Sequence, residues 1–200
     1  MTETSTVTAA TLLAALRQKH SGDAVVREVV IDDPYEFAIR RRAEIERARS
    51  WGEDQAEMVE RRYVEQGKLI ADAVPDGWNY RASKPQRRID ALIIASTGTT
   101  AVEIKVTRAD FRRDTDEKRR AWRAITNRFV YLVPKGLVAL EEVADGCGLW
   151  EFDADAHGKY RWQHGIVSVK RATTNKSPDP LPFQITRSLA YRVSNHERQA

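Results

Sequence analysis

The chain has 200 residues, of which 42% are hydrophobic and 31% are charged, with a net charge of +4 and a pI near 9.3. This length and composition are typical of one globular domain with a full core and short appendages. The sequence has neither an apolar run long enough to span a membrane nor a signal-peptide pattern, so we expect a soluble, cytoplasmic protein without a membrane partner. A single cysteine and four scattered histidines exclude a disulfide framework and argue against a zinc site.

The first segment, residues 1–53, is predicted to be a helical extension of the core. Three leucines at helical spacing predict a helix over residues 8–20, and residues 25–31 form a possible strand. Asp33-Pro34 is typical of a helix start, so a second helix is expected over residues 34–50. The arginines of that helix could touch a phosphate backbone, or they could lie on an ordinary solvated face beside the acids of the same helix.

The predicted core, residues 54–172, begins with a helix over residues 54–73. Its apolar stripe includes Tyr63, and one turn earlier the same stripe meets Glu60, so we expect this carboxylate to face the protein. A carboxylate on a buried face needs a partner, which could be a metal ion or a basic side chain. A short strand over residues 78–82 is predicted to follow.

Residues 87–107 are predicted to form a β-hairpin whose loop is Thr97-Gly98. In that register one face of the hairpin is wholly apolar. The other face carries Asp90, Glu103 and Lys105, with Asp90 opposite Lys105 and diagonal to Glu103. Because side chains alternate along a strand, a slip of one residue would separate these three groups.

This face of the hairpin has the residues of a metal site. Asp90 and Glu103 would lie roughly 7–8 Å apart between Cα atoms, a distance at which two carboxylates can hold one cation. Carboxylates so close repel each other unless one is protonated or a cation is present. We therefore predict binding of Mg²⁺ or Mn²⁺, with Lys105 orienting or deprotonating the attacking water or stabilising charge on a phosphate. The alternative is that these are ordinary solvated positions on an edge hairpin.

The remaining elements predict a mixed sheet. Thr107 to Asp110 is a capping-box pattern that opens a helix to about residue 125, and the strand after that helix implies a parallel crossover. That strand, a short helix and two further strands are expected at residues 129–133, 138–143, 149–152 and 160–169. Pro-rich residues 173–182 predict a linker, so residues 173–200 are assigned to a linker and tail.

Basic residues gather around the predicted metal site. Residues 81–128 carry 13 basic and six acidic side chains, a net charge of +7, so the rest of the chain has a net charge of −3. This distribution is typical of a protein that binds nucleic acid, although a solvated helix face with internal ion pairs would explain part of it. The candidate contacts to a phosphate backbone are Lys84, Arg87, Arg88, Arg108, Arg112 and Arg119.

The order helix, three strands, helix, strand, with Asp90 on the second strand and Glu103-Ile104-Lys105 on the third, resembles the PD-(D/E)xK nuclease superfamily. Over about residues 57–169 the chain looks most like the MmcB-type DNA repair proteins, because Arg108-Ala109-Asp110-Phe111 and the stretch from Trp122 to Phe129 follow that family's pattern. The usual proline before the aspartate is absent, and the segment between Phe111 and Lys118 looks longer than in the family.

The resemblance implies an α/β fold with a restriction-endonuclease-like core (αβββαβ), in which helices flank a mixed central sheet. It implies metal-ligand roles for Asp90, Glu103 and the backbone carbonyl of Ile104, and a catalytic role for Lys105. Glu60 is kept as a possible further ligand.

With the resemblance included, the expected function is that of a Mg²⁺-dependent DNA nuclease. It would hydrolyse phosphodiester bonds in repair or recombination, close to the nucleoid, with a homodimer as one possible assembly. Two alternatives stay open: a DNA-binding repair module on the same fold that does not cut, and an RNA nuclease.

Overall fold

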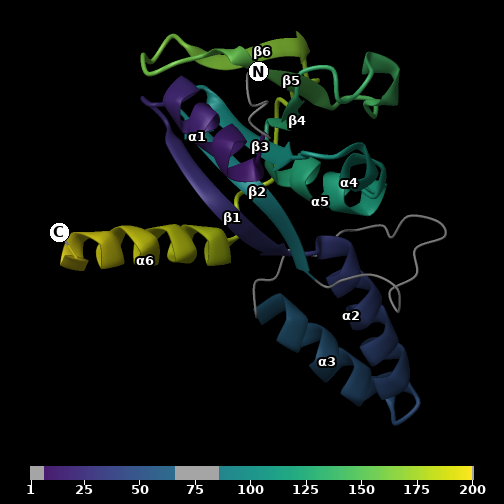
Figure 1. Ribbon diagram of the computed structural model, residues 1–200. Helices are drawn as coiled ribbons and strands as arrows, with labels where there is room; N and C mark the ends of the chain where they lie inside the picture. The colour runs from purple at the N-terminus through teal and green to yellow at the C-terminus, as the bar shows by residue number, and fades with distance from the viewer. Residues whose placement is uncertain (1–6, 66–85, 200) are drawn as a thin grey trace. The chain divides into compact units, whose positions relative to one another are not determined.

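The structure is a computed structural model that describes residues 7–65 and 86–199 (Figure 1). The strands form one six-stranded sheet in the order β1-β2-β3-β4-β5-β6. Their bounds are Ala24–Asp32, Gln86–Ala95, Gly98–Ile104, Arg128–Pro134, Gly148–His157 and His164–Lys170. The helices are α1 Ala9–Lys19, α2 Pro34–Arg49, α3 Glu53–Glu65, α4 Arg108–Arg112, α5 Asp116–Ile125 and α6 Phe183–Gln199, with a 3₁₀ turn η1 at Leu140–Glu142. The strand predicted at 78–82 and the end of the helix predicted to reach residue 73 lie outside the described residues.

The sheet is mixed, as predicted. Strand β2 is antiparallel to β3, β4 is parallel to both β3 and β5, and β6 is antiparallel to β5. Parallel neighbours need a crossover connection, and α4 and α5 provide it between β3 and β4. The protein is therefore a mixed α/β fold in which helices flank the sheet.

The apolar face of the β2–β3 hairpin is covered by α1. Leu12 and Leu16 are fully buried and share one core cluster with Ala91 and Val102 of the two strands. Each leucine buried in this way contributes about 1.5–3 kcal/mol. The wholly apolar face predicted from the sequence is confirmed, and α1 is the element that it packs against.

The hairpin register differs from the predicted one by two residues. Ala95 pairs with Gly98 and Ala91 with Val102, so the loop is Ser96-Thr97 and Gly98 is the first residue of β3. Because two is an even number, every side chain keeps its predicted face. The same register places Asp90 directly opposite Glu103, where the prediction had the two acids diagonal.

Packing against Asn127 explains why Gly98 is in the strand and not in the loop. Gly98 has a φ of +125°, which residues with a side chain rarely adopt, and a Cβ there would collide with the Asn127 side chain. The Asn127 amide oxygen accepts a hydrogen bond from the Thr99 N–H at 2.8 Å. The glycine thus admits a side chain from a distant part of the chain, which a local turn pattern does not show.

The helix predicted from residue 108 to about residue 125 is two helices. Thr107 caps α4 as predicted, since its hydroxyl accepts the Asp110 N–H at 3.1 Å. Thr115 is a second cap, in an extended conformation, and it accepts the Lys118 N–H at 3.4 Å to open α5. A residue that caps α5 in this conformation cannot also continue α4, so the chain breaks between the two helices.

The chain folds as two compact units. The first, called the sheet unit below, comprises Met1–Val29 with Arg88–Ala200, and the second comprises Val30–Arg87. The segment predicted as an N-terminal extension, residues 1–53, is divided between the two units, because α1 lies in the first unit and α2 in the second. In the second unit Asp33 is fully buried, accepts the Glu36 N–H at 3.4 Å and binds Nε of Arg87 at 2.6 Å.

The stretch predicted as a linker is tied to the sheet unit. Asn175 donates its N–H to the carbonyl of Asn127 at 2.8 Å, and Asp179 donates to that of Ala124 at 2.9 Å. Helix α6 follows this stretch. Within residues 7–65 and 86–199, no helix is long and apolar enough to cross a membrane.

Candidate metal centre

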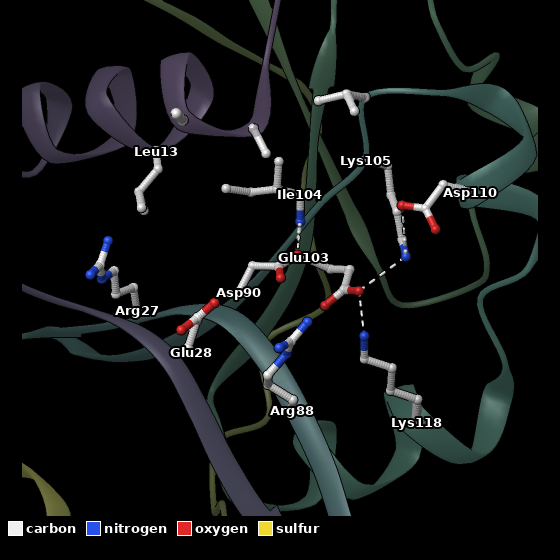
Figure 2. A pocket seen from close by; sticks show the side chains of 13 residues that line it. Leu13, Arg27, Glu28, Arg88, Asp90, Glu103, Ile104, Lys105, Asp110 and Lys118 are labelled. Carbon is white, nitrogen blue, oxygen red and sulfur yellow. Dashed lines mark hydrogen bonds and ion pairs between the residues drawn. The ribbon is translucent and has the colours of Figure 1, made fainter.

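A pocket of about 510 Å³ brings together Asp90, Glu103 and Lys105 (Figure 2). It lies where the C-terminal end of β3 meets β1, β2, α1 and the start of the β3–β4 crossover. The other residues that line it are Ala9, Ala10, Leu13, Arg27, Glu28, Arg88, Ile104, Val106, Asp110 and Lys118.

Glu103 lies at the bottom of this group and is 2% exposed. Its Oε1 accepts hydrogen bonds from Nζ of Lys105 at 3.0 Å and from Nζ of Lys118. Its Oε2 is buried and has no hydrogen-bond partner in the part of the chain that the structure describes. Burial raises the pKa of Glu103, and the Asp90 carboxylate raises it further, while Lys118 and Lys105 oppose both effects. A buried oxygen without a partner is costly, so this atom marks where a ligand would be stabilising.

Asp90 is held at the edge of the pocket by the backbone of β3. Its Oδ2 accepts the Ile104 N–H at 2.8 Å, which fixes the carboxylate beside Glu103. Ile104 thus lines the pocket and positions Asp90 through its N–H. The role predicted for the Ile104 carbonyl, that of a metal ligand, stays a prediction.

Lys105 is buried on the same side of the hairpin and is 7% exposed. Its ammonium lies 3.0 Å from Glu103 and 3.5 Å from Oδ2 of Asp110. Burial lowers the pKa of Lys105, but the carboxylates of Glu103, Asp110 and Asp114 outweigh burial and raise it. These carboxylates therefore favour the charged form of the amine.

Lys118, which the sequence interpretation did not select as a site residue, also lines the pocket. It reaches Glu103 from the first turn of α5, because Thr115 starts that helix at the right position. The sequence Thr115-Asp116-Glu117 is a recognisable N-cap followed by acids, and this signal could have revealed the second helix and its lysine.

A buried polar network holds the turn between α4 and α5. Asp114 accepts hydrogen bonds from the Tyr131 hydroxyl and from Nη1 of Arg119, the latter at 2.9 Å. Burial raises the pKa of Tyr131, and so does the Asp114 carboxylate. These contacts join the turn to β4 and so fix where α5 begins.

The wall of the pocket that β1 forms has a strained backbone. Glu28 has a φ of +50°, and it lines the pocket together with Arg27. Arg192 of α6 donates to the backbone carbonyls of both residues, at 2.7 Å to Arg27 and 3.3 Å to Glu28. Such strain persists only where the surroundings fix it, which here includes the guanidinium of Arg192.

The arginines predicted to contact phosphates have different environments. Arg88 is exposed and lines the pocket, and Arg112 is exposed and 3.8 Å from Glu142. Arg108 binds Glu142 at 2.6 Å. Arg87 and Arg119 are instead engaged with the buried carboxylates of Asp33 and Asp114, so they serve the fold. Lys84 lies outside the described residues.

Glu60 does not face a buried site in its own unit. Its carboxylate is 52% exposed and binds Arg41 of α2 at 2.6 Å. This is the ion pair that the sequence left open as the alternative to a metal. Glu60 lies at the edge of the apolar stripe, because Ala56 and Tyr63 are the buried residues of α3 and Val59, not Glu60, is partly buried between them.

The donor set of the pocket fits a hard divalent cation held by few protein ligands. Within the described residues, no group of three or more His, Cys, Asp or Glu side chains could hold a metal ion. Mg²⁺, however, commonly takes only one or two carboxylates. Asp90 and Glu103 face each other, and the buried Oε2 of Glu103 has no other partner among the described residues. These two carboxylates are the residues that would hold the ion.

Comparison with known proteins adds little to this geometry. No protein-family model and no curated protein matches the sequence. Among solved structures, a protein of unknown function from Silicibacter pomeroyi is similar, with 21% identity over 56% of this chain and 70% of that chain and a TM-score of 0.39. A likeness at this TM-score supports no statement about fold or function.

Proposed function

We propose that the protein is a Mg²⁺-dependent DNA nuclease of the PD-(D/E)xK type, with a restriction-endonuclease-like core. One observation carries the proposal: Asp90, Glu103 and Lys105 converge in one pocket, and the buried Oε2 of Glu103 has no partner among the described residues. The order of the elements from β2 through α5 to β4, with a parallel β3–β4 pair, supports the family resemblance.

The chemistry follows from the charges in the pocket. Mg²⁺ bound by Asp90 and Glu103 would acidify a water molecule and neutralise negative charge on the phosphate. Lys105, whose pKa is raised, would act as a fixed cation beside the developing charge on phosphorus. Arg88 and Arg27 on the pocket wall would attract the DNA backbone. Of the roles predicted for Lys105, a protonated amine can orient the attacking water or stabilise charge, but it cannot deprotonate that water.

The proposal is tested with labelled linear, circular and branched DNA, each incubated with and without Mg²⁺ or Mn²⁺. Asp90→Asn and Glu103→Gln should each abolish metal-dependent cleavage while leaving DNA affinity nearly unchanged. Glu103→Gln should also lower the free energy of unfolding, because two ammonium groups lose their shared carboxylate. Asp153→Asn is a matched control, because this acid binds Lys135 at 2.6 Å and does not line the pocket. Cleavage by Glu103→Gln at the wild-type rate would place the active site elsewhere.

A second candidate, a DNA-binding module that does not cut, is favoured by a different observation. Oε1 of Glu103 is bound by two ammonium groups, so much of its charge is already balanced without a metal. This candidate predicts metal-independent DNA binding and no cleavage of any of the three DNA forms.

A further inference from the structure

The tip of the β5–β6 hairpin, Gly158–Gln163, presents two aromatic rings to solvent. Trp162 is 75% exposed and Tyr160 is 48% exposed. Their ring centroids are 4.8 Å apart and their planes differ by 1°, so the rings are stacked on each other. Exposed aromatic side chains in a defined arrangement are typical of a binding surface.

Two glutamines hold the backbone of this tip. Gln163 donates its N–H to the Tyr160 carbonyl at 2.8 Å, and its own carbonyl accepts the Gly158 N–H at 2.8 Å. From α1, Gln18 donates through Nε2 to the carbonyls of Gly158, at 2.9 Å, and Tyr160. Its Oε1 accepts from Nε2 of His157 at 3.1 Å. A ligand that binds the rings therefore meets a loop whose backbone is already fixed, which lowers the entropy cost of binding.

The charge around the rings is positive. Residues 157–163 include Lys159 and Arg161 and no acidic residue. The Lys159 ammonium lies 5.2 Å from the centroid of the Tyr160 ring, and Arg161 is exposed. An exposed aromatic ring on a tip that carries two cations and no acid matches a base flanked by phosphates, and it does not suit a basic or purely aliphatic partner.

Helix α1 connects this tip to the carboxylate pocket. Ala9 lines the pocket and Gln18 binds the tip, and the two residues are nine positions apart, about 13 Å along a helix axis. Figure 1 shows the tip of the hairpin beside the C-terminal end of α1. The tip and the pocket are therefore contacted by opposite ends of one helix.

From these observations we propose that the stacked pair of Tyr160 and Trp162 forms a stacking site for an unpaired base of single-stranded DNA, with the base on the outer face of Trp162. The inference deepens the proposed function, since it names single-stranded DNA as the substrate class, but the stacking itself does not require cleavage. Stacking on an aromatic side chain strengthens binding on the order of tenfold per base. Lys159 and Arg161 would contact the phosphates on either side.

The test measures the affinity of the full chain for three labelled probes in EDTA by fluorescence anisotropy. The probes are an oligodeoxythymidylate, an abasic oligonucleotide with the same number of phosphates, and a blunt duplex of the same length. The wild type should bind the oligodeoxythymidylate most tightly. Tyr160→Ala combined with Trp162→Ala should weaken that binding by about tenfold or more and leave binding of the abasic strand unchanged.

Trp51→Ala is the matched control, because Trp51 is 74% exposed and lies in the other compact unit. It should bind all probes like the wild type, and Trp162→Phe should keep most of the affinity. Lys159→Ala with Arg161→Ala should weaken binding of both single strands and lower the salt slope by about 0.7 for each lost charge. The inference is overturned if the double aromatic variant binds thymidylate like the wild type, or if it loses the abasic strand equally.

The two proposals fail separately. Glu103→Gln should retain the full preference for thymidylate, because it does not touch the tip. If the wild type cuts no DNA, but the double aromatic variant binds thymidylate more weakly than the wild type does, the stacking site stands and the nuclease proposal falls. Cleavage without that loss would support the nuclease and overturn the stacking site.

Discussion

Glu103 is shared by two lysines from different elements. Lys105 follows β3, whereas Lys118 comes from α5, and both ammonium groups bind the same carboxylate oxygen. Lys118 has a side chain that is 25% exposed, against 8% for Lys105. We infer that Lys118 is the lysine that can leave when a cation enters, since solvent can take over its solvation.

Lys118→Met tests this difference. Without metal, loss of one charged hydrogen bond should lower the free energy of unfolding by about 1–3 kcal/mol. With Mn²⁺, the variant should show a larger metal-induced rise in melting temperature than the wild type, because no second ammonium competes for Glu103. Lys118→Arg is the control and should behave like the wild type. Equal metal-induced shifts in all three proteins would show that Lys118 and the cation do not compete.

Tyr131 should make the fold sensitive to alkaline pH. Burial and Asp114 raise its pKa, so the unfolded chain releases this proton at a lower pH, near 10, than the folded protein does. The unfolded state is therefore favoured as pH rises through that value, and stability falls. Urea unfolding between about pH 8 and 11 should show a shallower loss for Tyr131→Phe than for the wild type. Tyr191→Phe, at a site that is 67% exposed, should leave the wild-type slope unchanged.

Among the elements, the start of α5 decides whether Lys118 reaches the pocket. Thr115→Ala removes the hydroxyl that accepts the Lys118 N–H, which should cost about 1 kcal/mol of stability. If the protein is a nuclease, this variant should also reach half-maximal cleavage at a lower Mg²⁺ concentration, because Lys118 is held less firmly at Glu103 and competes less with the cation. Thr115→Ser keeps a capping hydroxyl and should restore both properties. A drop in stability with an unchanged Mg²⁺ requirement would limit Thr115 to a structural role.

Across the whole chain, the two compact units should differ in local stability. Most of the largest fully buried side chains, such as Trp122, Phe129 and Tyr131, belong to the sheet unit. The buried positions of α2 and α3 include the small side chains Ala38, Ala48 and Ala56. Opening free energy rises with the apolar area that opening exposes.

Hydrogen exchange measured by mass spectrometry tests this expectation. Peptides from α2 and α3 should exchange much faster than those from β3 and β4 under native conditions. The peptide that contains β4 serves as the internal standard for global unfolding. Equal protection in the helices and the strands would mean that the two units open together.

Local patterns in the sequence are enough to predict which side chains share a face. Along the hairpin, Ile, Val and Ala alternate with the charged residues Asp90, Glu103 and Lys105. A shift of the strand register by an even number of residues therefore leaves the charged groups on the face opposite the apolar one. The Thr107 cap and the parallel β3–β4 pair follow equally from local patterns. These features depend on period and on capping chemistry, which act over a few residues.

The exact strand pairing and the partners of the charges depend instead on long-range packing. The loop moved to Ser96-Thr97 because Asn127, far along the chain, packs against Gly98. Glu60 forms an ion pair with Arg41 of another helix and Arg119 forms one with Asp114 of the preceding turn, and spacing along one helix does not predict either partner. Lys118 lies in the pocket because the hydrogen bond between Asp114 and Tyr131 fixes the turn at which α5 begins. Such contacts depend on distances between segments remote in sequence, which residue spacing along one strand or helix does not specify.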